Sequence, residues 1–111
     1  AVASAIKNAA ANNLRNLEFH AADAASTMVS RNQGDFDLVV LDPPRSGNYQ
    51  ASREILRAGP QRVLYISCDP ATLVRDLAPL VHHGYQVLSA RAFDVFPQTW
   101  HIESMTLLAR P

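Results

Sequence analysis

Two short apolar runs constrain the fold of this chain more than any other feature. Residues 36–41 (FDLVVL) and 62–67 (RVLYIS) are rich in β-branched and aromatic side chains, and runs of this length suit strands that are buried on both faces of a sheet. Asp42-Pro43-Pro44 ends the first run, because proline has no N–H to donate to a neighbouring strand. A helix predicted over residues 49–58 joins the two runs, which indicates a parallel pair with a right-handed crossover.

The remaining segments continue this alternation of helices and strands. The alanine-rich start predicts a helix, Asp69-Pro70 is a typical helix start, and the loop between the last two strands indicates antiparallel neighbours. Pro79 should kink or limit the helix that contains it. Helices are expected over residues 1–13, 24–34 (short, with a loop) and 70–83, and strands over 17–20, 86–93 and 103–109. The order predicts an α/β fold with a mostly parallel sheet and an antiparallel final strand pair.

Composition bounds the functional classes. The chain has 111 residues, 48% of them hydrophobic, which is enough apolar material for one folded domain. Ten basic and ten acidic residues give a formal net charge of zero, so charge alone does not support nucleic-acid binding. The single cysteine excludes an internal disulfide, no apolar run approaches the roughly 20 residues that span a bilayer, and no secretory signal is visible. We therefore expect a cytoplasmic protein with no membrane segment.

Polar side chains follow three of the predicted strands. Asp23, Asp42 and Cys68 each come after such a strand, and in open α/β sheets ligands bind beyond the carboxyl ends of the strands. Cys68 also precedes a helix, whose N-terminal partial charge stabilises a thiolate, the reactive form of cysteine. A lone cysteine is more often a small buried hydrophobe, and the turn at Asp42 can serve only to end a strand.

A third polar cluster lies between the last two strands. Glu103 opens the final strand beside the loop of residues 94–101, where a carboxylate can act as a general base or remain a solvated side chain. His101 suits a base, a phosphate contact or an ordinary loop position. The single cysteine and the scattered histidines give no metal-ligand spacing, so no metal site is predicted.

Taken in order, three motifs resemble those of the RNA (uracil-5-)methyltransferase family, and within it the bacterial enzymes that methylate uridine in 23S ribosomal RNA. The motifs are residues 42–47 (DPPRSG), 67–73 (SCDPATL) and 96–105 (FPQTWHIESM), and the similarity covers essentially all 111 residues. The resemblance implies a Rossmann-like S-adenosylmethionine-dependent methyltransferase fold, with residues 1–111 as the C-terminal part of the catalytic domain.

This resemblance also leads us to expect further parts before Ala1. The Gly-rich cofactor motif, the acidic residue that holds the ribose, an iron–sulfur segment and an RNA-binding β-barrel of the family are not found in these 111 residues. An iron–sulfur cluster is thus expected only in an upstream segment. We expect residues 1–111 alone to bind S-adenosylmethionine poorly and to be inactive.

The same resemblance assigns roles to individual residues. Cys68 matches the nucleophile and Glu103 the base, while Asp42 and Asp23 match cofactor-binding positions, Asp23 at the adenosyl part. Candidate substrate contacts are Arg45, Gln98 and His101. The implied reaction is methyl transfer from S-adenosylmethionine to carbon 5 of a uridine in RNA, with 23S ribosomal RNA as the expected partner, through a covalent adduct between Cys68 and uracil.

Three alternatives stay open at the level of sequence. One is a uracil-5-methyltransferase that acts on tRNA, or another Rossmann-like methyltransferase that acts on RNA. Asp-Pro-Pro also resembles the turn of methyltransferases that modify an amino nitrogen, and these need no thiol. A non-catalytic RNA-binding module would need neither Cys68 nor Glu103.

Overall fold

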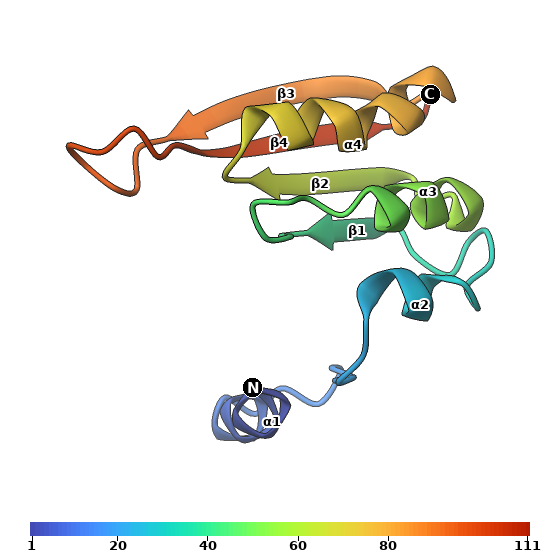
Figure 1. Ribbon diagram of the computed structural model, residues 1–111. Coiled ribbons are helices and arrows are strands. Elements are labelled where there is room, and N and C mark those ends of the chain that lie inside the picture. Colours follow the sequence, from blue (N-terminus) through green and yellow to red (C-terminus); the bar gives the residue numbers. More distant parts are fainter.

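The structure, a computed structural model, describes residues 1–111 and alternates helices with strands (Figure 1). Most of the predicted elements are present, and several boundaries agree to within a residue. The elements are α1 (Val2–Ala11), α2 (Ala24–Met28), β1 (Leu38–Leu41), α3 (Tyr49–Ala58), β2 (Arg62–Ser67), α4 (Pro70–His82), β3 (Gln86–Phe93) and β4 (Glu103–Ala109).

The four strands form one sheet in the order β1-β2-β4-β3. β1 and β2 are parallel, with Leu38 opposite Arg62, as the crossover through α3 predicts. β3 and β4 are antiparallel, as their connecting loop predicts. β4 also enters between β2 and β3 and runs antiparallel to β2. The parallel share of this sheet is therefore smaller than predicted, with one parallel pair and two antiparallel pairs.

The strand expected over Leu17–His20 does not form. These residues carry no regular secondary structure and pair with no strand, and Figure 1 shows this segment well apart from the sheet. A strand requires a neighbour for its N–H and C=O groups. The prediction was wrong because the residues of one short segment cannot supply that backbone partner.

The ends of α3 and α4 carry side-chain or glycine caps. The Asn48 side chain, which was not predicted as a cap, caps α3, and this helix ends at Gly59 in the left-handed conformation, with φ 58°. Asp69 caps α4, with Pro70 as its first residue. Pro79 lies inside α4 but does not end it, since the helix continues to His82. The expected limit on this helix is therefore not observed at the proline.

The core lies between the sheet and the helices on one of its faces. Figure 1 shows α3 and α4 on the same side of the sheet, and their apolar side chains pack with those of β2. The largest fully buried apolar side chains are Ile55, Val63, Tyr65, Leu80 and Leu108. Side chains elsewhere on the sheet remain exposed, among them Val40 at 52% and Leu88 at 57%. No helix combines the length and the apolar character that crossing a bilayer requires.

Candidate functional site

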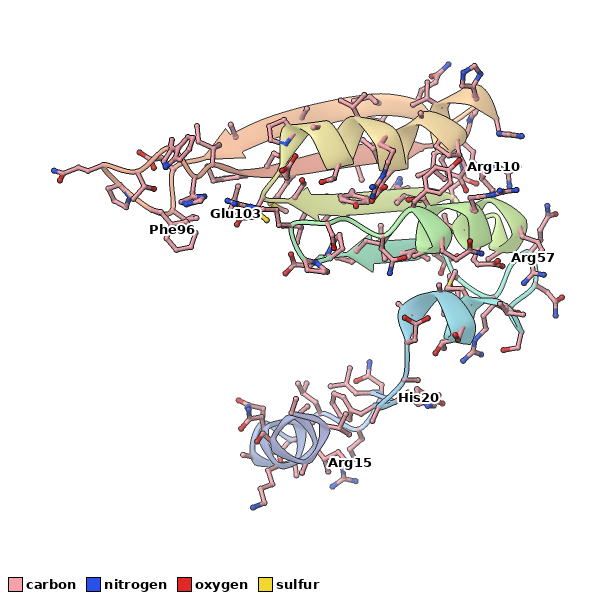
Figure 2. The ribbon with its side chains drawn as sticks, viewed as in Figure 1. Arg15, His20, Arg57, Phe96, Glu103 and Arg110 are labelled. Carbon is pink, nitrogen blue, oxygen red and sulfur yellow. The ribbon has the colours of Figure 1, made fainter.

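Three of the candidate residues meet at one rim of the sheet. Asp42 follows the end of β1 and Cys68 follows the end of β2. Glu103 is the first residue of β4, which runs in the opposite direction. Because Ser67 pairs with Ser104, the register places Cys68 and Glu103 at the next opposed positions. Figure 2 shows Glu103 at this end of the sheet, where β1 and β2 also finish.

Two pockets open at this rim. The first, which we call the thiol pocket, has a volume of about 340 Å³ and is lined by Cys68, Arg45, Trp100 and His101 among others. The second, the acid pocket, has a volume of about 440 Å³ and contains Asp42 and Glu103 beside apolar side chains of β2, β3 and β4. Cys68 is half-buried and faces the thiol pocket, so it is not sealed in the core.

The structure therefore brings most, but not all, of the predicted residues together. Cys68 shares a pocket with Arg45 and His101, and Asp42 shares one with Glu103. Asp23 and Gln98 line neither pocket. The Asp23 carboxylate caps α2, and the backbone hydrogen bond from Ser26, followed by the one from its side chain, lowers the pKa of this carboxyl below its usual 3.8. Gln98 is exposed in the long loop, at φ 64°.

A contact between two exposed side chains joins the turn after β1 to the loop before β4. Arg45 Nη2 lies 2.6 Å from His101 Nδ1, across 56 positions of sequence. A guanidinium can only donate, so His101 Nδ1 accepts and the imidazole proton resides on Nε2. This contact places a positive charge at the wall of the thiol pocket.

Asp69 modifies the expected influence of the helix on Cys68. Its carboxylate already accepts from the N–H groups of Ala71 and Thr72, at 2.9 and 3.1 Å. The N–H groups at the start of α4 were expected to favour a Cys68 thiolate. The Asp69 carboxylate already occupies two of these donors and offsets their positive partial charge. Arg45 is the cation that lines the same pocket as Cys68.

A buried carboxylate supports the turn that carries Asp42 and Arg45. Asp76, on α4, is fully buried and accepts hydrogen bonds from the Tyr65 hydroxyl and, at 2.6 Å, from the Asn48 N–H. Its other oxygen pairs with Arg75 at 2.7 Å. Burial, together with the hydrogen bond and the negative charge of Asp76, raises the pKa of Tyr65 well above its usual value of 10. The phenol therefore stays neutral and donates.

Further bonds fasten the same turn onto α4. Thr72 Oγ1 donates to the Arg45 carbonyl at 2.9 Å, and Arg75 Nη2 donates to the Ser46 carbonyl at 2.8 Å. Gly47 has φ 72°, and a Cβ there would overlap the Asp76 carboxylate. Sequence reasoning missed this support. One signal was available, since an aspartate occupies the apolar face of a helix that Leu77 and Leu80 otherwise define.

No cluster of three His, Cys, Asp or Glu side chains that could hold a metal ion is present. The polar groups at this rim are a thiol, two carboxylates, a guanidinium and an imidazole. They lie where the parallel strands β1 and β2 end, which is the edge at which open α/β sheets bind ligands.

Comparison with solved structures defines the class of this fold. A putative tRNA (m1A22) methyltransferase from Streptococcus pneumoniae, solved with S-adenosyl-L-methionine, superposes with a TM-score of 0.65 over 96% of this chain and 49% of that one. At 13% identity this likeness concerns the fold alone. Together with the more similar structure described below, it shows that the chain has the Rossmann-like fold of the S-adenosylmethionine-dependent methyltransferases.

Sequence comparison then identifies the family. The family model described as tRNA (Uracil-5-)-methyltransferase matches residues 1–111, and the chain belongs to this family. The chain is 44% identical to the 23S rRNA (uracil(1939)-C(5))-methyltransferase RlmD of Pseudomonas fluorescens, over 96% of this chain and 24% of that protein. It is 41% identical to an uncharacterized RNA methyltransferase of Thermotoga maritima, over 99% of this chain and 25% of that one.

A solved relative supports the same assignment. The tRNA (uracil-54, C5)-methyltransferase of Pyrococcus abyssi, solved with S-adenosyl-L-homocysteine, has a TM-score of 0.76 and 31% identity, over 95% of this chain and 25% of that one. The resemblance noted from the three motifs is thus confirmed. The chain spans about a quarter of the length of the relatives that it matches.

Proposed function

We propose that this chain is part of an enzyme that transfers a methyl group from S-adenosylmethionine to carbon 5 of a uridine in 23S ribosomal RNA. The observation that carries the proposal is the position of Cys68. Its half-buried thiol lines an open pocket beside Arg45, and Cys68 and Glu103 directly adjoin the last strand pair, Ser67 and Ser104. The 44% identity to an enzyme named for that reaction supports the choice of substrate. An enzyme with this substrate would work in the cytoplasm.

In this mechanism Cys68 is the nucleophile. Carbon 5 of uracil is a poor nucleophile until the Cys68 sulfur adds to carbon 6, which converts the ring to an enolate. The guanidinium of Arg45, at the wall of the same pocket, can stabilise the thiolate and the developing enolate oxygen. When bound, S-adenosylmethionine would supply the methyl group to carbon 5 as an electrophile and would leave as S-adenosyl-L-homocysteine.

Glu103 completes the reaction as the general base. After carbon 5 has gained the methyl group, it still carries its original hydrogen. The Glu103 carboxylate takes that proton, the electron pair of the C–H bond forms the carbon 5–carbon 6 double bond, and the bond from carbon 6 to Cys68 Sγ breaks. The opposed strand positions of Cys68 and Glu103 suit attack and deprotonation around one ring. His101 and Gln98 are proposed substrate contacts from the adjoining loop.

Two carboxylates are proposed to contact the cofactor. Asp42 is exposed and lines the acid pocket beside Phe93, Val95 and Met105, a combination of acceptor and apolar wall that suits a sulfonium and its alkyl arms. Asp23 would contact the adenosyl part. One oxygen of Asp23 is engaged by Ser26, which leaves the other free to accept from a ligand.

We further propose that residues 1–111 form the C-terminal part of the catalytic domain. The free edge of β1 and the unpaired Leu17–His20 segment support this, because additional strands between them would give both a backbone partner. Isothermal titration of the 111-residue chain with S-adenosylmethionine should then show weak binding, and a separate assay with RNA should show no methyl transfer. Low-micromolar affinity would contradict the assignment.

Trapping with RNA that carries 5-fluorouridine tests the central step. Fluorine cannot leave carbon 5 as a proton does, so a methylated RNA adduct should accumulate on Cys68 in the longer protein that this proposal implies. Mass spectrometry of the tryptic peptide would locate it, and the Cys68→Ala variant should give no adduct. Glu103→Gln should trap the methylated adduct with ordinary uridine RNA, because the proton on carbon 5 stays in place.

The outcomes separate the competing functions. Methylation that persists in Cys68→Ala would indicate a nitrogen methyltransferase. RNA binding without any adduct or methyl transfer would indicate a non-catalytic module. A tRNA substrate is favoured by the Pyrococcus abyssi relative, and parallel assays with 23S ribosomal RNA fragments and tRNA transcripts would decide between the two RNAs.

A further inference from the structure

The most exposed large apolar side chain of the structure is Trp100, at 93%. It lies in the loop between β3 and β4, together with Val95, Phe96 and Ile102, which are 53%, 52% and 49% exposed. Figure 2 shows Phe96 on this loop, which projects beyond the end of the sheet. Tryptophan is highly buried on average in folded proteins, and an exposed aromatic group beside polar residues is typical of a binding surface.

The position of Trp100 relative to Cys68 suggests what it binds. Both residues line the thiol pocket. The indole is 6.2 Å from the His101 ring at an angle of 40°, so its face is not covered by a stacked neighbour. Thr99 fixes the preceding backbone through its N–H and hydroxyl, which donate to the Phe96 carbonyl at 3.2 and 2.6 Å. The loop therefore presents a broad aromatic face at the mouth of the pocket.

We propose that Trp100 is a stacking platform for the base next to the target uridine in single-stranded RNA. The inference rests on the proposed function, since it places the target uracil against Cys68. A uracil that leaves its stack to enter the pocket deprives its neighbour of a stacking partner, and the indole replaces that partner. Arg45 and His101, in the same pocket, suit the phosphate and ribose of such a nucleotide. These polar neighbours favour RNA over an apolar protein segment as the occupant.

Stacking of a base on an aromatic side chain is tolerant of base identity, because every base has a π face. Trp100 would therefore add affinity for unpaired RNA without reading sequence. From the typical strength of such stacking, Trp100→Ala should weaken RNA binding by about 5- to 150-fold. Trp100→Phe, which keeps a smaller ring, should retain most of the affinity.

Intrinsic fluorescence offers a direct test, because Trp100 is the only tryptophan of the chain. A short single-stranded RNA with a central uridine should quench the emission of the 111-residue chain. Anisotropy of the same RNA, labelled at one end, then compares wild type with Trp100→Ala and Trp100→Phe. Leu88→Ala is the matched control, since Leu88 is exposed at 57% on β3, away from both pockets.

A cycle with modified RNA identifies the stacked base. Removing the base on one side of the uridine should lower the RNA affinity of the wild type as much as Trp100→Ala does. The same removal should not lower the RNA affinity of Trp100→Ala any further. Equal affinity of wild type and Trp100→Ala, or additive losses at both neighbouring positions, would overturn the stacking role. A different result would separate the two proposals. If RNA quenches Trp100 and the two losses are not additive, but no adduct forms on Cys68 in the longer protein, the methyl transfer would be refuted and the stacking site would stand.

Discussion

Replacing Asp76 with alanine tests whether the buried carboxylate holds the turn at the candidate site in place. The side chain is fully buried and accepts from Tyr65, Asn48 and Arg75. In Asp76→Ala the Tyr65 hydroxyl and the Asn48 N–H would lose this acceptor, and an unsatisfied buried donor costs about 1–3 kcal/mol. The Arg75 side chain is 50% exposed, so water can solvate its charge. The Tyr65 hydroxyl is fully buried whereas Asn48 is half-buried, so the expected loss is about 1–6 kcal/mol of unfolding free energy.

Equilibrium unfolding in urea, followed by circular dichroism, measures this loss. Glu54→Gln is the control, because Glu54 pairs with a half-exposed Arg57 on the same helix, and such pairs contribute at most about 1 kcal/mol. The double variant Tyr65→Phe/Asp76→Ala lacks the Tyr65 hydroxyl, so no donor is left without a partner at that position. It should therefore be more stable than the sum of the two single losses predicts. A loss in Asp76→Ala no larger than that of Glu54→Gln would refute the reasoning.

The same network has a pH signature. Burial and then the Asp76 contact raise the pKa of Tyr65 above its unfolded value of 10, so folding binds that proton more tightly. The resulting stability is fully present below pH 10 and is lost as the pH rises beyond it. Tyr65→Phe should remove this part of the alkaline loss. Urea midpoints measured from neutral pH to above pH 10 would show whether the two proteins diverge in that way.

Three further predictions concern backbone conformation and caps. Gly47→Ala should lower the unfolding free energy by about 1–3 kcal/mol, and by more than Gly34→Ala does. Both glycines have positive φ, but only Gly47 has atoms within 4 Å of the added methyl group. The urea midpoints of the two variants measure the difference. Asp69→Ala should cost about 0.5–2 kcal/mol through the lost cap of α4, measured in the same way. The pKa of Asp23 is lowered, so its cap stabilises α2 fully above pH 3.8, and this stabilisation is lost as the pH falls further. The protection of the Ser26 amide from hydrogen exchange should fall with pH in the wild type but not in Asp23→Ala.

Elements with local signals were predictable from the sequence. The strand of residues 62–67 and the helix of residues 49–58 match β2 and α3 in full. The apolar run marks the strand, and Gly59-Pro60 marks the end of the helix. The first strand begins at Leu38 rather than at the predicted residue 36. The parallel pairing and the antiparallel finish followed from connection lengths. The limits and pairings of these elements depend on residues that are close in sequence, so one sequence is enough to predict them.

Long-range contacts were not predictable in this way. The missing strand at Leu17–His20 depends on whether another strand lies beside it, and the path of β4 between β2 and β3 depends on the whole sheet. Asp76 joins Tyr65 and Asn48 across 11 and 28 positions, so no short motif contains the network. For the candidate site, the rim positions of Asp42, Cys68 and Glu103 were predictable from strand ends, whereas their division between two pockets was not.

Because β4 is antiparallel to β2, the spacing of Cys68 and Glu103 does not depend on the loop before Glu103. Had β4 run parallel to β2, its first residue would lie at the opposite end of the ladder, about 20 Å from Cys68 at the usual rise per residue. As folded, hydrogen bonds between two central strands set the spacing of sulfur and carboxylate, while the loop before Glu103 takes no part in that ladder. Changes in the length or sequence of this loop should therefore leave the spacing of the two groups unchanged.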